Sequence, residues 1–258
     1  SFDAQDVYLT WAAPEESPSW LHGFSIKGGK FATLLGAEVI EPWANFNLSR
    51  SFLYGYAIPV TNTGVMASYA INDSVSVTGG LVNGWDKVAS FNQGWTWMGG
   101  VAWAVCDQVS LNANGIVGPE QKNTGNKRGV MDLIATYKPI EPLTLQLNYD
   151  YGREAGANIT GGDALWQGIA GIANYAFTDR TSAAMRWEWF EDHGGSRTGT
   201  KQGLWEATLS GKYNITQHLF TRAEYRHDES SKEVFVASTD KLLAGQDTIG
   251  FEFGYLFN

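Results

Sequence analysis

The 258-residue chain has few of the residues that mark several common classes of protein. Its one cysteine, Cys106, excludes an internal disulfide and a multi-cysteine metal site, and no Cys-x-x-Cys-His stretch attaches a c-type haem. There are only 7 prolines and no low-complexity run to mark a linker. No stretch approaches the roughly 20 consecutive apolar residues of a membrane-spanning helix. The absences favour one continuous domain over residues 1–258.

Positive charge is also scarce, since 18 Lys and Arg face 27 Asp and Glu, a net charge of −9. This balance argues against nucleic acid as a partner. Among the four histidines His193 lies near a serine, Ser196, in a glycine-rich stretch, and a Ser-His pair also needs an orienting acid or amide. We therefore predict no catalytic residue, no metal site and no cofactor.

Aromatic residues are plentiful, at 14% with 11 Trp, although the mean hydropathy is only −0.23. Many segments alternate apolar and polar residues. In Leu143-Thr-Leu-Gln-Leu-Asn-Tyr-Asp-Tyr151 every second side chain is Leu or Tyr, and in Ile249–Phe257 every second side chain is aromatic or aliphatic. Strands of period two place such residues on one face. Aromatic-rich strands with modest hydropathy are typical of outer-membrane β-barrels, in which half of each strand meets lipid.

About thirteen such strands follow one another. We expect them at residues 4–11, 22–32, 62–71, 74–84, 95–106, 108–118, 128–138, 142–152, 164–177, 180–191, 203–213, 217–227 and 247–257. Short turns alternate with longer polar connections at 85–94, 119–127, 153–163, 192–202 and 228–246. Bacterial barrels have this asymmetry, with the short turns in the periplasm.

The expected fold is all-β: a transmembrane, antiparallel, up-and-down β-barrel of fourteen strands, or alternatively sixteen, with about thirteen in this chain. If the last strand ends in the periplasm, the first strand points the same way. Bacterial single-chain barrels normally close with an even number of strands, because an open edge leaves unpaired amides in lipid. We therefore expect at least one further strand before Ser1.

Residues 32–61 interrupt the alternation and carry the charged residues Glu38, Glu41 and Arg50. A connection of this length without regular structure is usually functional. We predict that it folds into the barrel as a pore constriction formed by these three residues. The alternative is an external loop, which its Ile, Val, Trp and Phe content disfavours.

The polar faces of the strands predict the pore wall. They carry equal numbers of basic and acidic residues, so the acidic excess of the chain lies in loops, turns and strand ends. A balanced wall suits a general diffusion pore, and acidic loops favour cations weakly. Several of these charges should form a cross-strand ladder. The wall residues are Asp132, Asp150, Arg186, Glu188, Glu206, Arg222, Glu224 and Arg226.

Stretches along nearly the whole chain resemble the OmpL-like β-barrel porins of bacterial outer membranes. They include Gly36-Ala-Glu-Val-Ile-Glu41, Asn47-Leu-Ser-Arg-Ser-Phe52, Val82-Asn-Gly-Trp-Asp86, Asn148-Tyr-Asp-Tyr-Gly152, Arg197-Thr-Gly199 and Arg222-Ala-Glu-Tyr-Arg-His-Asp228. The resemblance implies a pore but no particular substrate. The chain departs from the family where Asn258 follows Phe257, since family members tend to end on an aromatic residue.

The predicted function is an outer-membrane porin for passive diffusion of small hydrophilic solutes or ions. Two alternatives stay open: a barrel scaffold for a partner such as an outer-membrane multihaem cytochrome, and an outer-membrane lipid hydrolase that uses His193. The expected partners are outer-membrane lipid and small hydrophilic solutes, with a homo-oligomer or a periplasmic or extracellular protein as further options.

Overall fold

A computed structural model describes residues 4–89, 94–122, 124–238 and 241–257. The parts of the predicted loops 85–94, 119–127 and 228–246 that fall between these ranges lie outside the described residues. The main strands are β1 (Val7–Ala12), β2 (Phe24–Ala32), β3 (Thr61–Ala70), β4 (Val75–Val82), β5 (Thr96–Cys106), β6 (Val109–Pro119), β7 (Lys127–Ile140), β8 (Leu143–Glu154), β9 (Ala164–Ala176), β10 (Thr181–Asp192), β11 (Gln202–Asn214), β12 (Leu219–Ser230) and β15 (Gly245–Tyr255).

These strands form one 13-stranded sheet in which each strand pairs antiparallel with its neighbours in the sequence. The predicted all-β, up-and-down architecture is therefore confirmed. A separate hairpin, β13 (Phe235–Ser238) with β14 (Lys241–Leu243), lies between β12 and β15 in the chain. Within the described residues β1 and β15 form the two edges of the sheet, with no ladder between them. A further strand before Ser1 stays a prediction.

Side chains alternate between two faces of the curved sheet. On β8 the outward residue Leu147 is 47% exposed, whereas its neighbour Asn148 points inward and is buried. On β15 Phe251, Phe253 and Tyr255 all point outward and are exposed. An exposed apolar band of this extent belongs in lipid, and the inward face then belongs to the interior of a barrel.

Short turns close one rim of the sheet, and their side chains fix their geometry. Asn72 accepts the backbone N–H groups of Ser74 and Val75 through its side-chain oxygen, at 2.9 Å each. Thr178 and Thr216 bond in the same way to the backbone two and three residues on. These Asx- and ST-type turns are compact. From β2 onward the longer connections lie at the opposite rim, whereas residues 13–23, between β1 and β2, form a longer connection at the short-turn rim. By the rule for bacterial barrels, the rim opposite the short turns is extracellular.

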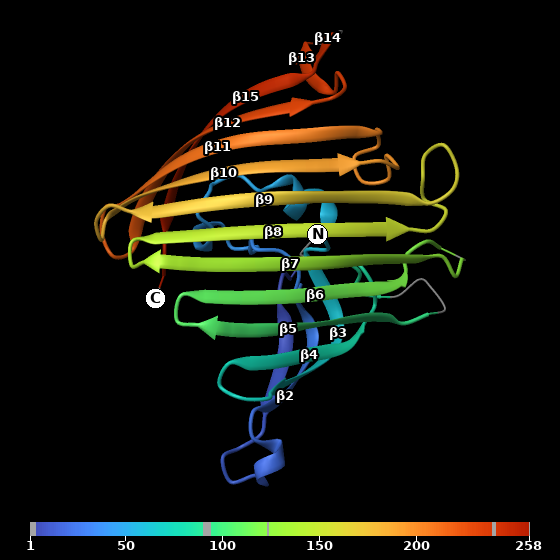
Figure 1. Ribbon diagram of the computed structural model, residues 1–258, viewed down its shortest axis with the longest axis vertical. Coiled ribbons are helices and arrows are strands. Elements are labelled where there is room, and N and C mark those ends of the chain that lie inside the picture. Colours follow the sequence, from blue (N-terminus) through green and yellow to red (C-terminus); the bar gives the residue numbers. More distant parts are fainter. Residues whose placement is uncertain (1–3, 90–93, 123, 239–240, 258) are drawn as a thin grey trace.

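The connection between β2 and β3, residues 33–60, is the inner loop. It contains a 3₁₀ turn η2 (Pro42–Ala44) and a short π-helix η3 (Leu53–Ala57). In Figure 1 this blue segment passes behind β8, β9 and β10, and η3 contacts both β8 and β9. Its apolar residues pack on inward side chains of the strands, so the hydrophobic core lies inside the curved sheet. The loop members of this core are Leu35, Phe52, Leu53, Ala57 and Ile58.

Among the described residues, no helix is both long enough and apolar enough to cross a membrane.

Candidate functional site

The inner loop is bound to the wall through its own backbone. The carboxylate of Glu188 on β10 accepts the N–H groups of Phe52 and Leu53, each at 2.6 Å. The carboxylate of Glu224 on β12 accepts those of Leu48 and Ser49, at 2.6 and 2.9 Å. A loop inside a barrel has no ladder to satisfy its amides, and unpaired buried amides are costly. The wall carboxylates take the place of that ladder.

Wall arginines bind the carbonyl groups of the same stretch. Arg186 donates to the Ser49 carbonyl at 2.7 Å, and Arg222 donates to the Asn47 carbonyl at 2.6 Å. Arg226 donates to the carbonyl of Arg50 at 2.5 Å. Acidic and basic wall residues thus bind opposite sides of one backbone segment, residues 47–53.

The same wall residues are linked to one another across the strands. Arg186 and Glu206, on β10 and β11, pair at 2.5 Å, and Arg226 on β12 approaches Glu206 at 3.9 Å. Arg222 faces Glu252 on β15 at 3.4 Å. The predicted cross-strand ladder is therefore confirmed. Pairing of this kind is what makes buried charges tolerable.

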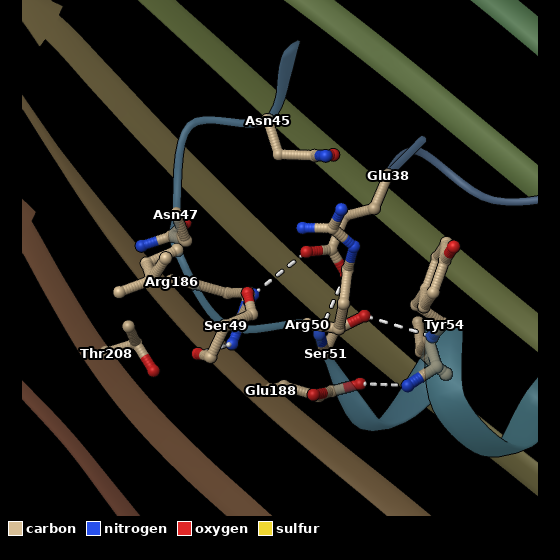
Figure 2. Close-up of polar contacts among 12 residues, drawn as sticks. Glu38, Asn45, Asn47, Ser49, Arg50, Ser51, Tyr54, Arg186, Glu188 and Thr208 are labelled. Atoms are coloured by element: carbon tan, nitrogen blue, oxygen red, sulfur yellow. Dashed lines mark hydrogen bonds and ion pairs between the residues drawn. The ribbon is translucent and has the colours of Figure 1, made fainter. Parts of the chain in front are cut away.

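The loop contributes one carboxylate of its own to this network. Glu38 binds Arg186 at 2.9 Å and accepts the Ser51 N–H at 2.8 Å, and it is almost fully buried. Figure 2 shows Glu38, Arg186 and Glu188 gathered around the 49–54 stretch. The loop is thus held by side-chain and backbone contacts at once.

The three predicted constriction residues do not share one environment. Glu38 faces the wall, as described above. Glu41 is partly exposed and accepts a hydrogen bond from Gln5 at 2.9 Å. Arg50 is partly exposed, donates to the Ile40 carbonyl at 2.8 Å and lies 5.2 Å from the centre of the Tyr54 ring. Burial of the Tyr54 phenol raises its pKa above the ordinary 10.0, so the phenol is neutral at physiological pH.

The predicted wall residues all face the interior, and most of them form hydrogen bonds or ion pairs with the inner loop. Asp132 and Asp150 instead face each other directly across β7 and β8, both fully buried. Asp132 accepts the amide groups of Asn114 and Asn148, at 2.9 and 2.7 Å. Neither oxygen of Asp150 has a hydrogen-bond partner among the described residues. Asn148 also accepts the N–H of Ala37, which links this pair to the inner loop.

Several residues that matter here carried no clear signal in the sequence. Asn47 and Ser49 contribute carbonyl groups, and carbonyls are the same in every residue. Tyr54 lies in an apolar stretch that reads as core. The stretch from Asn47 to Phe52 is nonetheless among those that resemble the porin family. The resemblance marks the stretch but does not indicate that its backbone binds the wall.

No group of three or more His, Cys, Asp and Glu that could hold a metal ion occurs among the described residues. The absence of a cofactor stays a prediction.

Solved structures with a similar fold are outer-membrane proteins. The loop L8 deletion mutant of OmpT from Vibrio cholerae superposes with a TM-score of 0.62 at 15% identity, over 91% of this chain and 76% of that one. The outer-membrane channel DcaP of Acinetobacter baumannii superposes with a TM-score of 0.64 at 10% identity, over 91% of this chain and 73% of that one. An anion-selective porin from Comamonas acidovorans superposes with a TM-score of 0.60 at 12% identity, over 89% of this chain and 69% of that one.

No relative of this chain is found among curated proteins. The model of the family described as "Putative beta-barrel porin-2, OmpL-like" matches residues 4–257, which is nearly all of the sequence. With the antiparallel sheet, the apolar outer band and the loop folded inside it, this match establishes the family. The chain belongs to the OmpL-like β-barrel porins and is a porin of the bacterial outer membrane.

Proposed function

We propose that small hydrophilic solutes diffuse passively through the interior of this barrel, and that the inner loop sets their size limit. The observation that carries the proposal is the fixed position of residues 47–53, which five wall side chains bind from both sides. A loop held by buried charge pairs keeps one shape, and a fixed obstacle gives a sharp size limit.

Open space at the short-turn rim supports this reading. A cavity of about 560 Å³ lies between the 43–46 stretch of the loop and polar side chains near the short-turn rim, among them Asn174, Ser182 and Lys212. A second cavity, of about 680 Å³, lies at the same rim and is lined by Ser76, Asn112 and other residues of β3 to β6. Both are suited to water and to hydrophilic solutes.

The ion preference of this constriction should be weak. Glu38 is neutralised by Arg186, so the charges left at the exposed face of the loop are Glu41 and Arg50, one of each sign. The acidic excess of the external connections adds only a screened field, because the Debye length is about 8 Å at physiological salt. We infer a general diffusion pore rather than a strongly selective one.

We infer no enzymatic activity. The ring of His193 lies 3.7 Å from the carboxylate of Glu191, and the Ser196 hydroxyl has no hydrogen-bond partner among the described residues. A hydrolase would need that hydroxyl bonded to the imidazole. The scaffold alternative is disfavoured because the protein's own loop packs in the interior that a threaded partner would need.

We extend the proposal to a homo-oligomer, since OmpT of Vibrio cholerae has been solved in a trimer form. The mass of the purified protein in detergent, measured by light scattering, tests this point.

The proposed transport is tested by liposome swelling with the purified protein, using neutral sugars of graded size. The expected result is rapid swelling with the smallest sugars and a cut-off over a narrow size range. Swelling with no sugar of any size would contradict passive diffusion, and turnover of a fluorogenic phospholipid that depends on His193 would support the hydrolase instead.

A further inference from the structure

Two arginines meet one indole ring at the extracellular end of the interior. Arg128 begins β7, Arg197 lies in the connection between β10 and β11, and Trp85 lies in the connection between β4 and β5. The guanidinium carbon of each arginine is 4.7 Å from the centre of the Trp85 ring. Arg197 is also 5.2 Å from the ring of Trp166 on β9. Stacking on an aromatic face orients a guanidinium and leaves its N–H edge available.

The two guanidinium groups differ in their counter-charges. Arg128 is paired through Nε with Glu154 at 2.7 Å. Arg197 donates its Nε–H to the Tyr56 carbonyl at 2.6 Å, but no described carboxylate lies within ion-pair distance of it. Burial, and then the nearby charge of Arg128, lower the pKa of Arg197 to about 10. The carboxylates of Glu154, Asp192 and Asp86 raise the pKa of Arg197 in part, but from beyond ion-pair distance. The fold thus holds a half-buried cation close to a second cation, with no carboxylate in direct contact with it.

The carboxylates in the neighbourhood are already engaged by other donors. Glu120 accepts the backbone N–H of Trp85 and the ammonium of Lys87. Asp192 accepts the backbone N–H groups of residues 196–198, and Asp86 accepts those of residues 60 and 61. None of these three carboxylates forms a hydrogen bond or an ion pair with Arg197 among the described residues.

Trp85 adds an unused donor. Its side chain is 5% exposed, and its indole Nε1–H has no acceptor among the described residues. A buried indole N–H normally finds an acceptor. By contrast Trp166, packed beside it with ring centres 6.2 Å apart, donates to the Ala57 carbonyl at 3.1 Å. The two arginines and the indole therefore keep N–H donors beyond those that Glu154 and the Tyr56 carbonyl accept.

We propose that Arg128, Arg197 and Trp85 form a binding site for an oxyanion, the carboxylate or phosphate group of a small solute, at the extracellular mouth of the pore. Several oxygen lone pairs on one anionic group match guanidinium N–H edges together with an indole N–H, and charge-assisted bonds of this kind are strong. A chloride ion cannot present separate acceptor atoms to separate donors. The role as an entry site rests on the proposed porin function, whereas the binding itself does not.

The test is calorimetric titration of the purified, folded protein with sodium succinate, with inorganic phosphate and with sodium chloride, all at one ionic strength. We expect saturable heat with succinate or phosphate and none with chloride, and binding of only one of the two identifies the oxyanion. Arg128→Gln and Arg197→Gln should each weaken binding about tenfold or more, because each removes a charge-assisted donor. Arg128→Gln keeps the bond from Arg197 to Tyr56. If Arg197→Gln fails to fold, the anion affinity of Arg128→Gln alone tests the site.

The matched control is Arg153→Gln. Arg153 lies at the same rim but outward, exposed and paired with Asp163 at 2.6 Å. Its loss should leave binding unchanged. Equal binding of chloride, no saturable heat with any anion, or equal affinity in the wild type, Arg128→Gln and Arg197→Gln would each overturn the site. Conductance in planar bilayers separates the two proposals, since binding without conductance contradicts the pore and conductance without binding contradicts the site.

Discussion

Arg186 on β10 and Glu38 in the inner loop form an ion pair of 2.9 Å, although they are 148 positions apart in the sequence. Arg186 is fully buried and is shared with Glu206 on β11. The pair connects the loop to the wall at the point where the cross-strand ladder is densest. A network that looks like the lining of a pore therefore acts first as the attachment of the loop.

The first prediction concerns this pair. Glu38→Gln keeps the shape of the side chain but removes its charge, so the bond to Arg186 weakens and Glu206 is left as the ion-pair partner of Arg186. Hydrogen bonds to charged groups contribute roughly 1.5–3 kcal/mol. We expect the free energy of unfolding in lipid vesicles, measured with urea, to fall by about that amount.

Glu41→Gln is the control for this change. Glu41 is partly exposed, and the only described hydrogen bond of its side chain is to Gln5. Loss of its charge should therefore alter stability by less than about 0.5 kcal/mol. The reversal potential in a salt gradient should shift away from cations with Glu41→Gln. If Glu41→Gln destabilised the protein as much as Glu38→Gln, the assignment of Glu38 as the attachment point would be wrong.

The second prediction concerns the two facing carboxylates. Asp150 and Asp132 repel each other when both are charged, and Asp150 has no described donor. Asp150→Asn supplies an N–H donor to Asp132, so we expect unfolding free energy to stay unchanged or to rise by about 1 kcal/mol. Asp132→Asn should lower the unfolding free energy, because the amide donors of Asn114 and Asn148 then lose the charged carboxylate that accepts both of them. The opposite ranking in the same unfolding assay would show that Asp150 has a partner of its own.

The third prediction tests the two faces of the wall with adjacent residues. Val101 is an outward residue in the middle of β5, and Ala102 is exposed towards the interior. Val101→Arg places a charge in the lipid and should cost roughly 2–4 kcal/mol. Ala102→Arg should be nearly neutral, because its charge remains in water. Equal costs, measured by reversible unfolding in vesicles, would contradict the assignment of the faces.

The fourth prediction concerns pH at the extracellular rim. Asp163, in the connection between β8 and β9, binds Arg153 at 2.6 Å and accepts the N–H of Gly156 at 3.1 Å. These bonds, that to Arg153 above all, lower the pKa of Asp163 below its ordinary 3.8. A lowered pKa stabilises the closed connection above about pH 3.8, and the effect is lost as the pH falls through the lower value of the folded state.

Hydrogen exchange of residues 155–163, corrected for the intrinsic rate, should therefore accelerate as the pH falls below 3.8. Arg153→Gln should remove most of this pH dependence. The same pH profile in wild type and Arg153→Gln would mean that another group controls the connection.

Much of the fold could be predicted from the sequence because the relevant interactions are local. The alternation in Leu143–Tyr151 predicts β8 within a few residues of its observed bounds, Leu143–Glu154. The short turns follow from Asn72 and Thr178, whose side chains bond to their own backbone. The β13–β14 hairpin was not predicted, because it lies in a polar connection without a clear alternation.

The attachment of the inner loop could not be predicted. Glu38 reads as a free constriction charge until β10 places Arg186 beside it, and no local pattern connects the two. Trp85 and Arg197 were recognised only as parts of stretches that resemble the family. Their meeting depends on two connections, β4–β5 and β10–β11, that come together at one rim. Such contacts arise only when the sheet has formed.

The central claim is that the inner loop narrows a conducting pore, and single-channel conductance tests it most directly. Residues 39–46 can be replaced by a short Gly-Ser linker, which keeps Glu38 and the anchored stretch 47–53 in place. The account predicts steady conductance in the wild type, and a larger conductance with passage of larger sugars in the variant. Unchanged conductance and size cut-off would contradict the constriction, and the absence of conductance in both proteins would contradict the pore itself.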